Sequence, residues 1–313
     1  MMAFLLQVVL LVVGFVMLVK GADWFVGGAA KIADKFGIPH LIVGLTIVAM
    51  GTSAPETAVS ISASLKGGAD IAVGNVLGSN ILNVMIILGI TAVIHAISVQ
   101  TSTVRYEIPF CIFISVLLVC LGLFDGGLSR IDGVILWAFM IAYLMYLLYM
   151  VKKGKENLEE EDTVGNVSGI VLAVMVVGGG AMIVLGANVT VNAATEIATM
   201  LGMSQRLIGL TIVALGTSLP ELMASVTAAR KGNSDIAIGN ILGSNIFNIL
   251  FVLGTSALIT PVSYTKNFTV DSIVCVCSVV ILLLCVLPKK KLNRTGGVVL
   301  LAGYVAYFVY LLV

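Results

Sequence analysis

Ten long apolar stretches follow one another along the 313-residue sequence, and they decide what kind of fold it can adopt. Hydrophobic residues make up 59% of the chain and charged residues 11%, whereas a soluble domain is about half apolar and a quarter charged. The polar residues are too few to cover the outside of a water-soluble fold. The short segments of alternating polarity that are typical of membrane β-barrels do not occur. The sequence therefore predicts an all-α integral membrane protein embedded in the lipid bilayer.

The predicted spans share a length near or above the roughly 20 residues that cross a bilayer as a helix. They are 4–30, 38–65, 70–94, 104–124, 129–151, 168–200, 206–229, 235–258, 267–287 and 294–313. The first and sixth stretches are longer than needed, so we expect long, tilted helices there. The first also lacks the basic residue that precedes the apolar run of a secretory signal peptide, so we interpret it as a structural helix.

The second half of the sequence repeats the first. Residues 44–89 align with residues 209–254 without a gap, with 28 identical residues in 46 positions. Repeats of this kind indicate two structural units of the same fold. We therefore expect residues 1–150 to form a first five-helix repeat, residues 168–313 to form a second, and the charged segment 151–167 to link them in the cytoplasm.

Five crossings is an odd number, so the second repeat must lie upside down relative to the first. The positions of Lys and Arg give the orientation, because cytoplasmic loops are enriched in these residues. With the N-terminus outside, the cytoplasmic loops hold 12 basic residues and the outside loops hold four. We expect both termini outside the cell membrane and two inverted repeats, which is an architecture of secondary transporters.

One six-residue pattern stands inside the second and the seventh predicted spans, as GTSAPE (51–56) and GTSLPE (216–221). Proline lacks the N–H of a helical hydrogen bond and its ring clashes with the preceding turn, so we expect each span to break there. Carbonyl groups freed inside a membrane are tolerated where they line a polar cavity or find partners. The side chains that would line such a cavity are Thr52, Ser53 and Glu56, matched by Thr217, Ser218 and Glu221.

A second repeated pattern, GNVLGSNILN (74–83) and GNILGSNIFN (239–248), lies in the third and eighth predicted spans. Its two glycines are four residues apart, which lets helix backbones approach closely. Its serine and final asparagine are also four apart, so both lie on one helix face. These pairs are Ser79 with Asn83, and Ser244 with Asn248.

Together the two patterns supply two carboxylates, hydroxyls, amides and freed carbonyls, with no histidine or cysteine among them. Oxygen ligands suit hard cations, and Ca²⁺ takes six to eight of them in a flexible geometry. Two acids at mid-membrane are costly and repel each other. One divalent cation neutralises both, as do two or more monovalent cations or two protons. We therefore expect an antiporter whose site reorients only when its charge is balanced.

These residues resemble the sodium/calcium exchanger branch of the cation/Ca²⁺ antiporter superfamily, in its prokaryotic type, over nearly the whole chain. The resemblance implies ten helices, with interrupted helices 2, 3, 7 and 8 forming a core that binds the cations. It implies ligands from the first half at Thr52, Ser53, Glu56, Ser79 and Asn83, and from the second half at Thr217, Ser218, Glu221, Ser244 and Asn248, joined by the backbone carbonyls of Ala49 and Ala214. It also implies that the first and sixth helices slide as gates, and that Ca²⁺ is exchanged for Na⁺ without a cofactor.

The resemblance also bears on the counter-ion. Potassium-dependent exchangers carry Asp where this chain has Asn248, and both repeats here carry Asn, which makes potassium co-transport less favoured. The proton/calcium branch usually has an acid in its second pattern, so Na⁺ is favoured here. The alternative is a proton-coupled exchanger of Ca²⁺ or another divalent cation. We expect a monomeric functional unit and no nucleic-acid partner.

Other functions have less support in the sequence. An intramembrane hydrolase using Glu56 and Glu221 as an acid pair is an alternative, but there is no HExxH pattern and no Ser with a nearby His in any span. A passive channel is another. We expect Asp23 to accept an interhelical hydrogen bond, and Asp70 and Asp235 to lie at helix ends. The five cysteines are expected to pack as small hydrophobic side chains.

Overall fold

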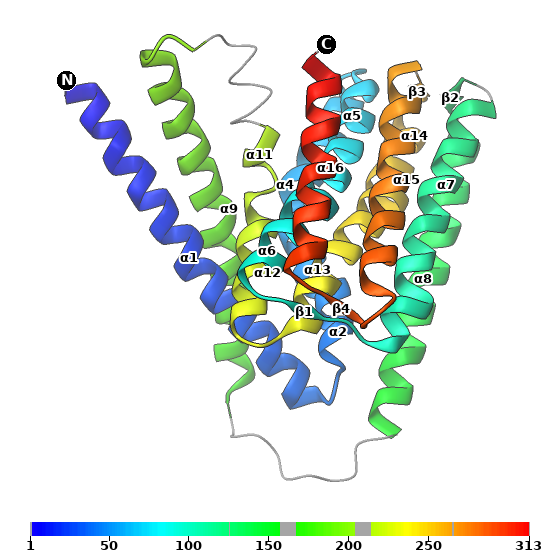
Figure 1. The fold of residues 1–313 in the computed structure, drawn as a ribbon, viewed down its shortest axis with the longest axis horizontal. Helices are drawn as coiled ribbons and strands as arrows, with labels where there is room; N and C mark the ends of the chain where they lie inside the picture. The colour runs from blue at the N-terminus through cyan, green and yellow to red at the C-terminus, as the bar shows by residue number, and fades with distance from the viewer. Residues whose placement is uncertain (1, 125, 157–166, 204–213, 265, 313) are drawn as a thin grey trace.

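Figure 1 shows the computed structural model of the chain, which describes residues 2–124, 126–156, 167–203, 214–264 and 266–312. Apart from two pairs of two-residue strands, the regular structure of these residues is helical. The structure thus confirms the predicted all-α class. The ends of the chain lie at one end of the molecule, whereas α8 ends and α9 begins at the opposite end.

The N-terminal half of the chain contains helices and short π-helical segments, the latter labelled η. They are α1 (Met2–Phe36), α2 (His40–Val43), η1 (Gly44–Val48), α3 (Ala49–Thr52), α4 (Ala54–Leu65), α5 (Ala69–Leu82), η2 (Asn83–Leu88), α6 (Gly89–Ile94), η3 (Thr103–Glu107), α7 (Ile108–Phe124) and α8 (Arg130–Glu156). The strands here are β1 (Ile97–Ser98) and β2 (Gly127–Leu128).

The C-terminal half follows a similar order. Its helices are α9 (Gly169–Met200), α11 (Ala214–Gly216), α12 (Leu219–Arg230), α13 (Ser234–Phe247), η5 (Asn248–Leu253), α14 (Gly254–Ile259), α15 (Lys266–Val286) and α16 (Arg294–Leu312). The strands are β3 (Val262–Ser263) and β4 (Lys291–Leu292).

Within the described residues, eight helices are long and apolar enough to cross a membrane, and nine if the bent pair 40–65 counts as one span. The chain is therefore a multi-pass membrane protein. Part of the seventh predicted span, residues 206–213, lies outside the described residues. Two boundaries differ from prediction. Helix α1 continues to Phe36, past the predicted end at residue 30, and α8 continues to Glu156, so that the first six residues of the predicted linker, 151–156, are helical. Lys and Glu favour helix, so the helix extends past the apolar stretch.

Helices α1 and α9 pack against each other in opposite directions, to the left of the other helices in Figure 1. Paired glycines let the two backbones touch. A Cβ atom placed on Gly186 would lie 2.9 Å from the Gly14 carbonyl oxygen, and one on Gly179 would lie 2.9 Å from the Gly21 carbonyl oxygen. Alanine at these positions would therefore push the two helices apart.

The core of the molecule lies around the two helical runs that carry the second repeated pattern. In the most apolar stretch of the run 70–94, 72% of the residues are buried, and in that of the run 234–259 the share is 94%. The corresponding share is 17% in α1. Both inner runs are also less apolar than α1, so the polar side chains of the repeated pattern are enclosed by protein.

The prediction that helices 2, 3, 7 and 8 are interrupted needs a correction for two of them. The second span is broken, but residues 70–94 and 234–259 each form one continuous run. Neither run contains proline, so the backbone hydrogen bonds continue. Instead, each run changes to π-helical winding, at Asn83 and Asn248 respectively. Such π segments inside α-helices are frequent at functional sites.

Short strands join the two halves of the chain. Strand β1 pairs antiparallel with β4, with Ile97 opposite Leu292, and β2 pairs with β3, with Leu128 opposite Val262. Strands β1 and β3 occupy equivalent positions when the repeat alignment is extended. In each half, therefore, the strand that follows the third span pairs with a strand of the other half.

Candidate functional site

The second span breaks beside the first repeated acid. The helical run 40–52 and helix α4 meet at Ser53 with a bend of 52°. Pro55 lies in the first turn of α4, where its missing N–H leaves no helical hydrogen bond unmade. Glu56 follows in the same turn. The proline thus acts as the sequence predicts, and the acid is held at the N-terminus of a helix.

The second repeated acid has the same surroundings. A turn at 217–218 separates α11 from α12, and Pro220 and Glu221 lie in the first turn of α12. The N-terminal end of a helix carries unpaired N–H groups and the positive end of the helix dipole. Both acids are therefore placed where the backbone stabilises negative charge.

Both acids are buried, with Glu56 and Glu221 each 1% exposed. Neither carboxyl oxygen of Glu56 has a hydrogen-bond partner. Ser53 Oγ donates to Glu221 Oε1 at 3.0 Å, while Glu221 Oε2 has no partner. This bond joins the break in one half to the acid of the other. Three buried carboxyl oxygens, two of Glu56 and one of Glu221, therefore lie without donors beside two breaks that are hydrogen-bonded to each other.

Four asparagines connect the helical runs of α5 and α13. Asn80 Nδ2 donates to the backbone oxygen of Asn245 at 3.2 Å, and Asn245 Nδ2 donates to the backbone oxygen of Asn80 at 3.1 Å. Asn83 Nδ2 donates to Asn245 Oδ1 at 3.0 Å, and Asn248 Nδ2 donates to Asn80 Oδ1 at 3.1 Å. Because Asn80 aligns with Asn245 and Asn83 with Asn248 in the repeat, the two halves exchange the same bonds here. We call this set the asparagine brace.

The asparagine brace determines which way two of its amides face. Asn83 and Asn248 use their NH₂ groups in the brace, so their Oδ1 atoms take no part in it. Both residues are buried, and neither Oδ1 atom has a hydrogen-bond partner. Ser218 Oγ is a further buried oxygen without one. Buried polar atoms without partners are costly in a folded protein, so these oxygens are suited to bind something else.

Two further asparagines each connect a helix break to the core helix of the same half. Asn75 Nδ2 donates to the Glu56 backbone oxygen at 3.2 Å, and Asn240 Nδ2 donates to the Glu221 backbone oxygen at 3.3 Å. Thr52 Oγ1 donates to Asn240 Oδ1 at 3.1 Å. The first turn behind each acid is thus fixed to the neighbouring core helix, which limits where the carboxyl group can move.

The structure places most of the predicted site residues in this cluster. Ala49 lies at the junction, since its carbonyl accepts from Thr52 Oγ1 at 3.2 Å and from Ser244 Oγ at 3.4 Å. The predicted residues connected by hydrogen bonds at the breaks and the brace are Ala49, Thr52, Ser53, Glu56, Asn83, Glu221, Ser244 and Asn248.

The remaining predicted residues are less closely joined to the cluster. Ser79 and Ser218 are buried. Thr217 is only partly buried and makes no hydrogen bond to another described residue. Ala214 begins α11, and the surroundings of its side chain lie outside what the structure describes.

The sequence reasoning missed the asparagines that orient the site. Asn75, Asn80, Asn240 and Asn245 stand inside the quoted patterns, yet only the final asparagine of each was selected. Their signal was present, because each recurs at the aligned position of the other half and buried amides in a membrane require partners. A search for repeated polar residues, rather than for oxygen ligands alone, would have found them.

Other polar residues lie near the predicted places. The backbone oxygen of Asp23 accepts a hydrogen bond from Lys231 Nζ at 2.8 Å, and the Asp23 carboxylate forms an ion pair with the same Nζ at 3.1 Å. Asp70 and Asp235 lie in the first turns of α5 and α13. Asp235 also accepts from Gln100 Nε2 at 2.6 Å. All five cysteines are free thiols.

The fold and the site define a class of protein. The multi-pass helical fold, the buried carboxylate, amide and hydroxyl oxygens from both halves, and the family and structural matches together support a cation/Ca²⁺ antiporter. The sequence model of the family described as sodium/calcium exchanger protein matches residues 6–150 and 171–313. The chain belongs to this family.

Individual relatives cover almost the full length. The inner membrane protein YrbG of Escherichia coli (strain K12) is 37% identical over 319 residues, with 98% of this chain and 97% of that protein covered. The putative antiporter CaxA of Alkalimonas amylolytica is 41% identical over 315 residues, with 97% and 98% covered. The solved structure of the sodium-calcium exchanger NCX_Mj, soaked with zero Na⁺ and Ca²⁺, superposes with a TM-score of 0.85 at 32% identity, with 98% and 99% covered.

Proposed function

We propose that the protein exchanges Ca²⁺ for Na⁺ across the cell membrane by alternating access to a site built around Glu56 and Glu221. The observation that carries this proposal is the set of buried carboxyl oxygens that have no hydrogen-bond donor and belong to two helix breaks joined by the Ser53–Glu221 hydrogen bond. The likeness to NCX_Mj, which is named a sodium-calcium exchanger, supports the choice of the two ions.

The charge of the site explains why binding and exchange are coupled. Two buried carboxylates cost free energy unless cations compensate them. One Ca²⁺ supplies two positive charges, and two or more Na⁺ ions supply the same or more. The site can therefore change its access from one side to the other with either Ca²⁺ or Na⁺ bound. The empty site carries two uncompensated negative charges, and their free-energy cost opposes this change.

The ligands that we propose come from both breaks and both core helices. The carboxylates of Glu56 and Glu221 would neutralise the cation, and neutral oxygens would complete its shell. These neutral oxygens belong to Thr52, Ser53, Ser79, Asn83, Thr217, Ser218, Ser244 and Asn248, with the backbone carbonyls of Ala49 and Ala214. The asparagine brace supports this set, because it leaves Asn83 Oδ1 and Asn248 Oδ1 as acceptors.

We further propose that the chain forms ten spans as two inverted repeats, 1–150 and 168–313, with the linker 151–167 inside and both termini outside. The gapless sequence repeat supports this division, as does the exchange of strands between the halves. Helices α1 and α9 would slide together as gates, which suits their position beside the remaining helices (Figure 1). All predicted ligands come from one chain, so a monomer is a sufficient functional unit.

The test is Ca²⁺ uptake into membrane vesicles that contain the purified protein, with pH clamped on both sides. An outward Na⁺ gradient should drive uptake, and replacing Na⁺ with K⁺ or choline should abolish it. If a proton gradient alone drives full uptake and Na⁺ has no effect, the protein is a proton-coupled exchanger and the Na⁺ proposal is wrong. Flux that needs no cation on the far side would indicate a channel.

A further inference from the structure

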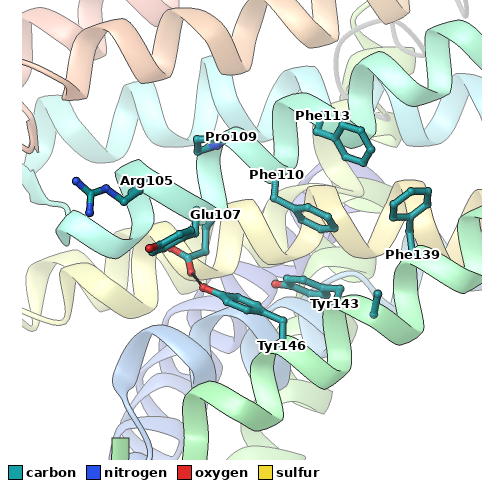
Figure 2. Close-up of a pocket in the computed structure, with 10 residues that line it drawn as sticks. Arg105, Glu107, Pro109, Phe110, Phe113, Phe139, Tyr143 and Tyr146 are labelled. Carbon is teal, nitrogen blue, oxygen red and sulfur yellow. Dashed lines mark hydrogen bonds between the residues drawn. The ribbon is translucent and has the colours of Figure 1, made fainter. Parts of the chain in front are cut away.

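A second polar site lies away from the repeated patterns, between α7 and α8. A cavity of about 520 Å³ lies there, and the side chains that line it are mainly aromatic rings (Figure 2). Phe110 stacks on Tyr143 with ring centroids 5.5 Å apart, and Phe113 meets Phe139 edge to face at 5.4 Å. Two of its lining residues, Tyr106 and Phe113, are exposed at the surface. Its walls therefore form an apolar groove on the outer face of two membrane-spanning helices.

One end of this groove carries polar groups with unused bonding capacity. Glu107 is 1% exposed, and Tyr146 Oη donates to its Oε1 atom, while Glu107 Oε2 has no hydrogen-bond partner. The Tyr143 hydroxyl is also buried without a partner. Figure 2 shows the Tyr146 hydroxyl meeting Glu107, with the Arg105 side chain at the same end of the cavity. A buried carboxyl without a cationic partner is costly, as in the case of the transport acids.

Glu107 lies near one end of an apolar span, where we expect the lipid head groups. It is the fifth residue of the span Thr103–Phe124, so a helical rise of about 1.5 Å per residue puts it about 6 Å from the end of that span. Arg105 is closer to the end and exposed. An acid and a base therefore lie within one turn of each other at the membrane boundary, above an aromatic groove that continues toward the bilayer centre.

The second half of the chain carries a counterpart of the acid and its tyrosines. The first residues of α8 and α16, Arg130 and Arg294, align with an offset of 164 residues, since 294 − 130 = 164. In this register the positions equivalent to Glu107, Tyr143 and Tyr146 are Asp271, Tyr307 and Tyr310. Tyr307 Oη donates to Asp271 Oδ1 at 2.8 Å, and Asp271 is only partly buried. The buried oxygens without partners, Glu107 Oε2 and Tyr143 Oη, therefore distinguish the groove of the first half from its counterpart.

The chemical groups that line the groove indicate which kind of molecule binds there. A carboxylate beside aromatic faces binds a primary ammonium group by charge, hydrogen bonds and cation–π attraction. A guanidinium at the rim binds a phosphate. Apolar rings accept an acyl chain. A zwitterionic phospholipid with a primary amine combines these three parts, and the bilayer brings it to this surface.

We propose that the groove between α7 and α8 is a binding site for an aminophospholipid of the phosphatidylethanolamine class. Its ammonium group is bound by Glu107 Oε2 and the Tyr143 hydroxyl. Its phosphate is paired with Arg105, and an acyl chain lies against Phe110 and Phe113. The site binds lipid independently of the transported cations.

Binding can be measured on the purified full-length protein after detergent removes its native lipid. Phosphatidylethanolamine, phosphatidylcholine and phosphatidylglycerol with identical acyl chains are each added at one molar ratio. We expect phosphatidylethanolamine to raise the unfolding temperature by about 3 °C more than the other two, and one molecule to stay bound in native mass spectrometry. Equal effects of the three lipids would mean that the rings only contact the bilayer, and would overturn the proposal. A preference for phosphatidylglycerol would also overturn it, because the site would then recognise the phosphate and not the ammonium group.

Two variants test the residues. Glu107→Gln keeps the shape of the side chain but removes its charge, and Tyr143→Phe removes only a hydroxyl. Both should lose the preference for phosphatidylethanolamine while staying monodisperse in detergent. The matched control is Asp271→Asn, which changes an acid that accepts a hydrogen bond from Tyr307 at 2.8 Å on the other half, and it should keep the preference. Full preference in both Glu107→Gln and Tyr143→Phe would refute the assignment.

Discussion

Replacing Glu221 with Gln removes one of the two buried charges while keeping the size of the side chain. Ser53 can still donate to the remaining carbonyl oxygen, so the hydrogen bond between the halves, 3.0 Å in the native chain, can survive. The variant should therefore fold. Its site, however, carries one negative charge in place of two, which a divalent ion overcompensates. We expect Ca²⁺ exchange to be abolished.

The size of this effect follows from the burial of the acid. Glu221 is 1% exposed, so water screens its charge poorly. At about 4 Å and an effective dielectric constant of about 20, two unit charges attract by about 4 kcal/mol. On the same scale, a carboxylate attracts Ca²⁺ by about 8 kcal/mol and Na⁺ by about 4 kcal/mol. Since each 1.4 kcal/mol or so is a factor of ten, and the amide oxygen recovers part of the loss, Ca²⁺ affinity should fall by at least about 1,000-fold.

The assay compares wild type with Glu221→Gln in vesicles, with the initial rate of Ca²⁺ uptake measured under a fixed Na⁺ gradient. Thermal unfolding with and without Ca²⁺ shows whether the purified variant is folded and whether it binds the ion. Glu196→Gln changes an exposed acid on α9 and should behave as wild type in both measurements. Calcium uptake near the wild-type rate in Glu221→Gln would refute the charge argument.

Three other predictions concern the neutral ligands, the pH and the asparagine brace. Asn83→Ala and Asn248→Ala each remove one neutral oxygen, so Ca²⁺ transport should weaken by about 10- to 100-fold with altered selectivity among divalent ions, as measured by competition with Sr²⁺ and Mn²⁺. Lowering the pH from 8 to 5 should inhibit uptake progressively, because protons compete for the same carboxylate oxygens; a flat profile of initial rates would contradict this. Asn80→Ala removes the partner of the Asn248 amide and should cost about 1–3 kcal/mol of stability, visible as a lower unfolding temperature; an unchanged temperature would mean that the asparagine brace does not hold the helices.

The sequence was sufficient for the parts of this fold that local chemistry decides. Apolar length predicted most described spans to within a few residues, because crossing the bilayer requires that length, whereas the ends of α1 and α8 lie further along the chain than predicted. Pro55 predicted a break at Ser53, because proline interrupts helical hydrogen bonding wherever the helix lies. The burial of Glu56 and Glu221 was also predicted, since repeated acids inside apolar spans have few other uses.

The features that depend on how distant helices meet were not predictable in this way. The asparagine brace joins Asn80 to Asn245, and no periodicity in one helix indicates the partner in another. The π segments at Asn83 and Asn248 were missed for a related reason, because their sequences contain no proline to mark a change of winding. Glu107 was not selected because it stands alone at the edge of a span, and its tyrosine partner lies on the next helix.

The sequence also does not predict that the two copies of the second repeated pattern have different surroundings. Gly239 is buried against the first half, where an added Cβ would lie 2.8 Å from the Leu41 carbonyl oxygen. Its counterpart Gly74 is exposed, and an added Cβ would only touch the Phe268 ring at 3.7 Å. Identical residues thus occupy a tight and an open position in one structure, although the repeat would predict the same packing for both.

In the proposed mechanism, the two glycines exchange their surroundings when the site opens to the other side of the membrane. Gly74 then becomes closely packed, as Gly239 is in this structure. Gly239→Ala should then lower the unfolding temperature, because the contact is already made, whereas Gly74→Ala should keep or slightly raise it, since alanine favours helix by about 1 kcal/mol. Both variants should nevertheless slow Na⁺-driven Ca²⁺ uptake, Gly239→Ala by straining the present state and Gly74→Ala by blocking the other. A stable Gly74→Ala variant that transports at the wild-type rate would show that the two halves do not exchange their packing.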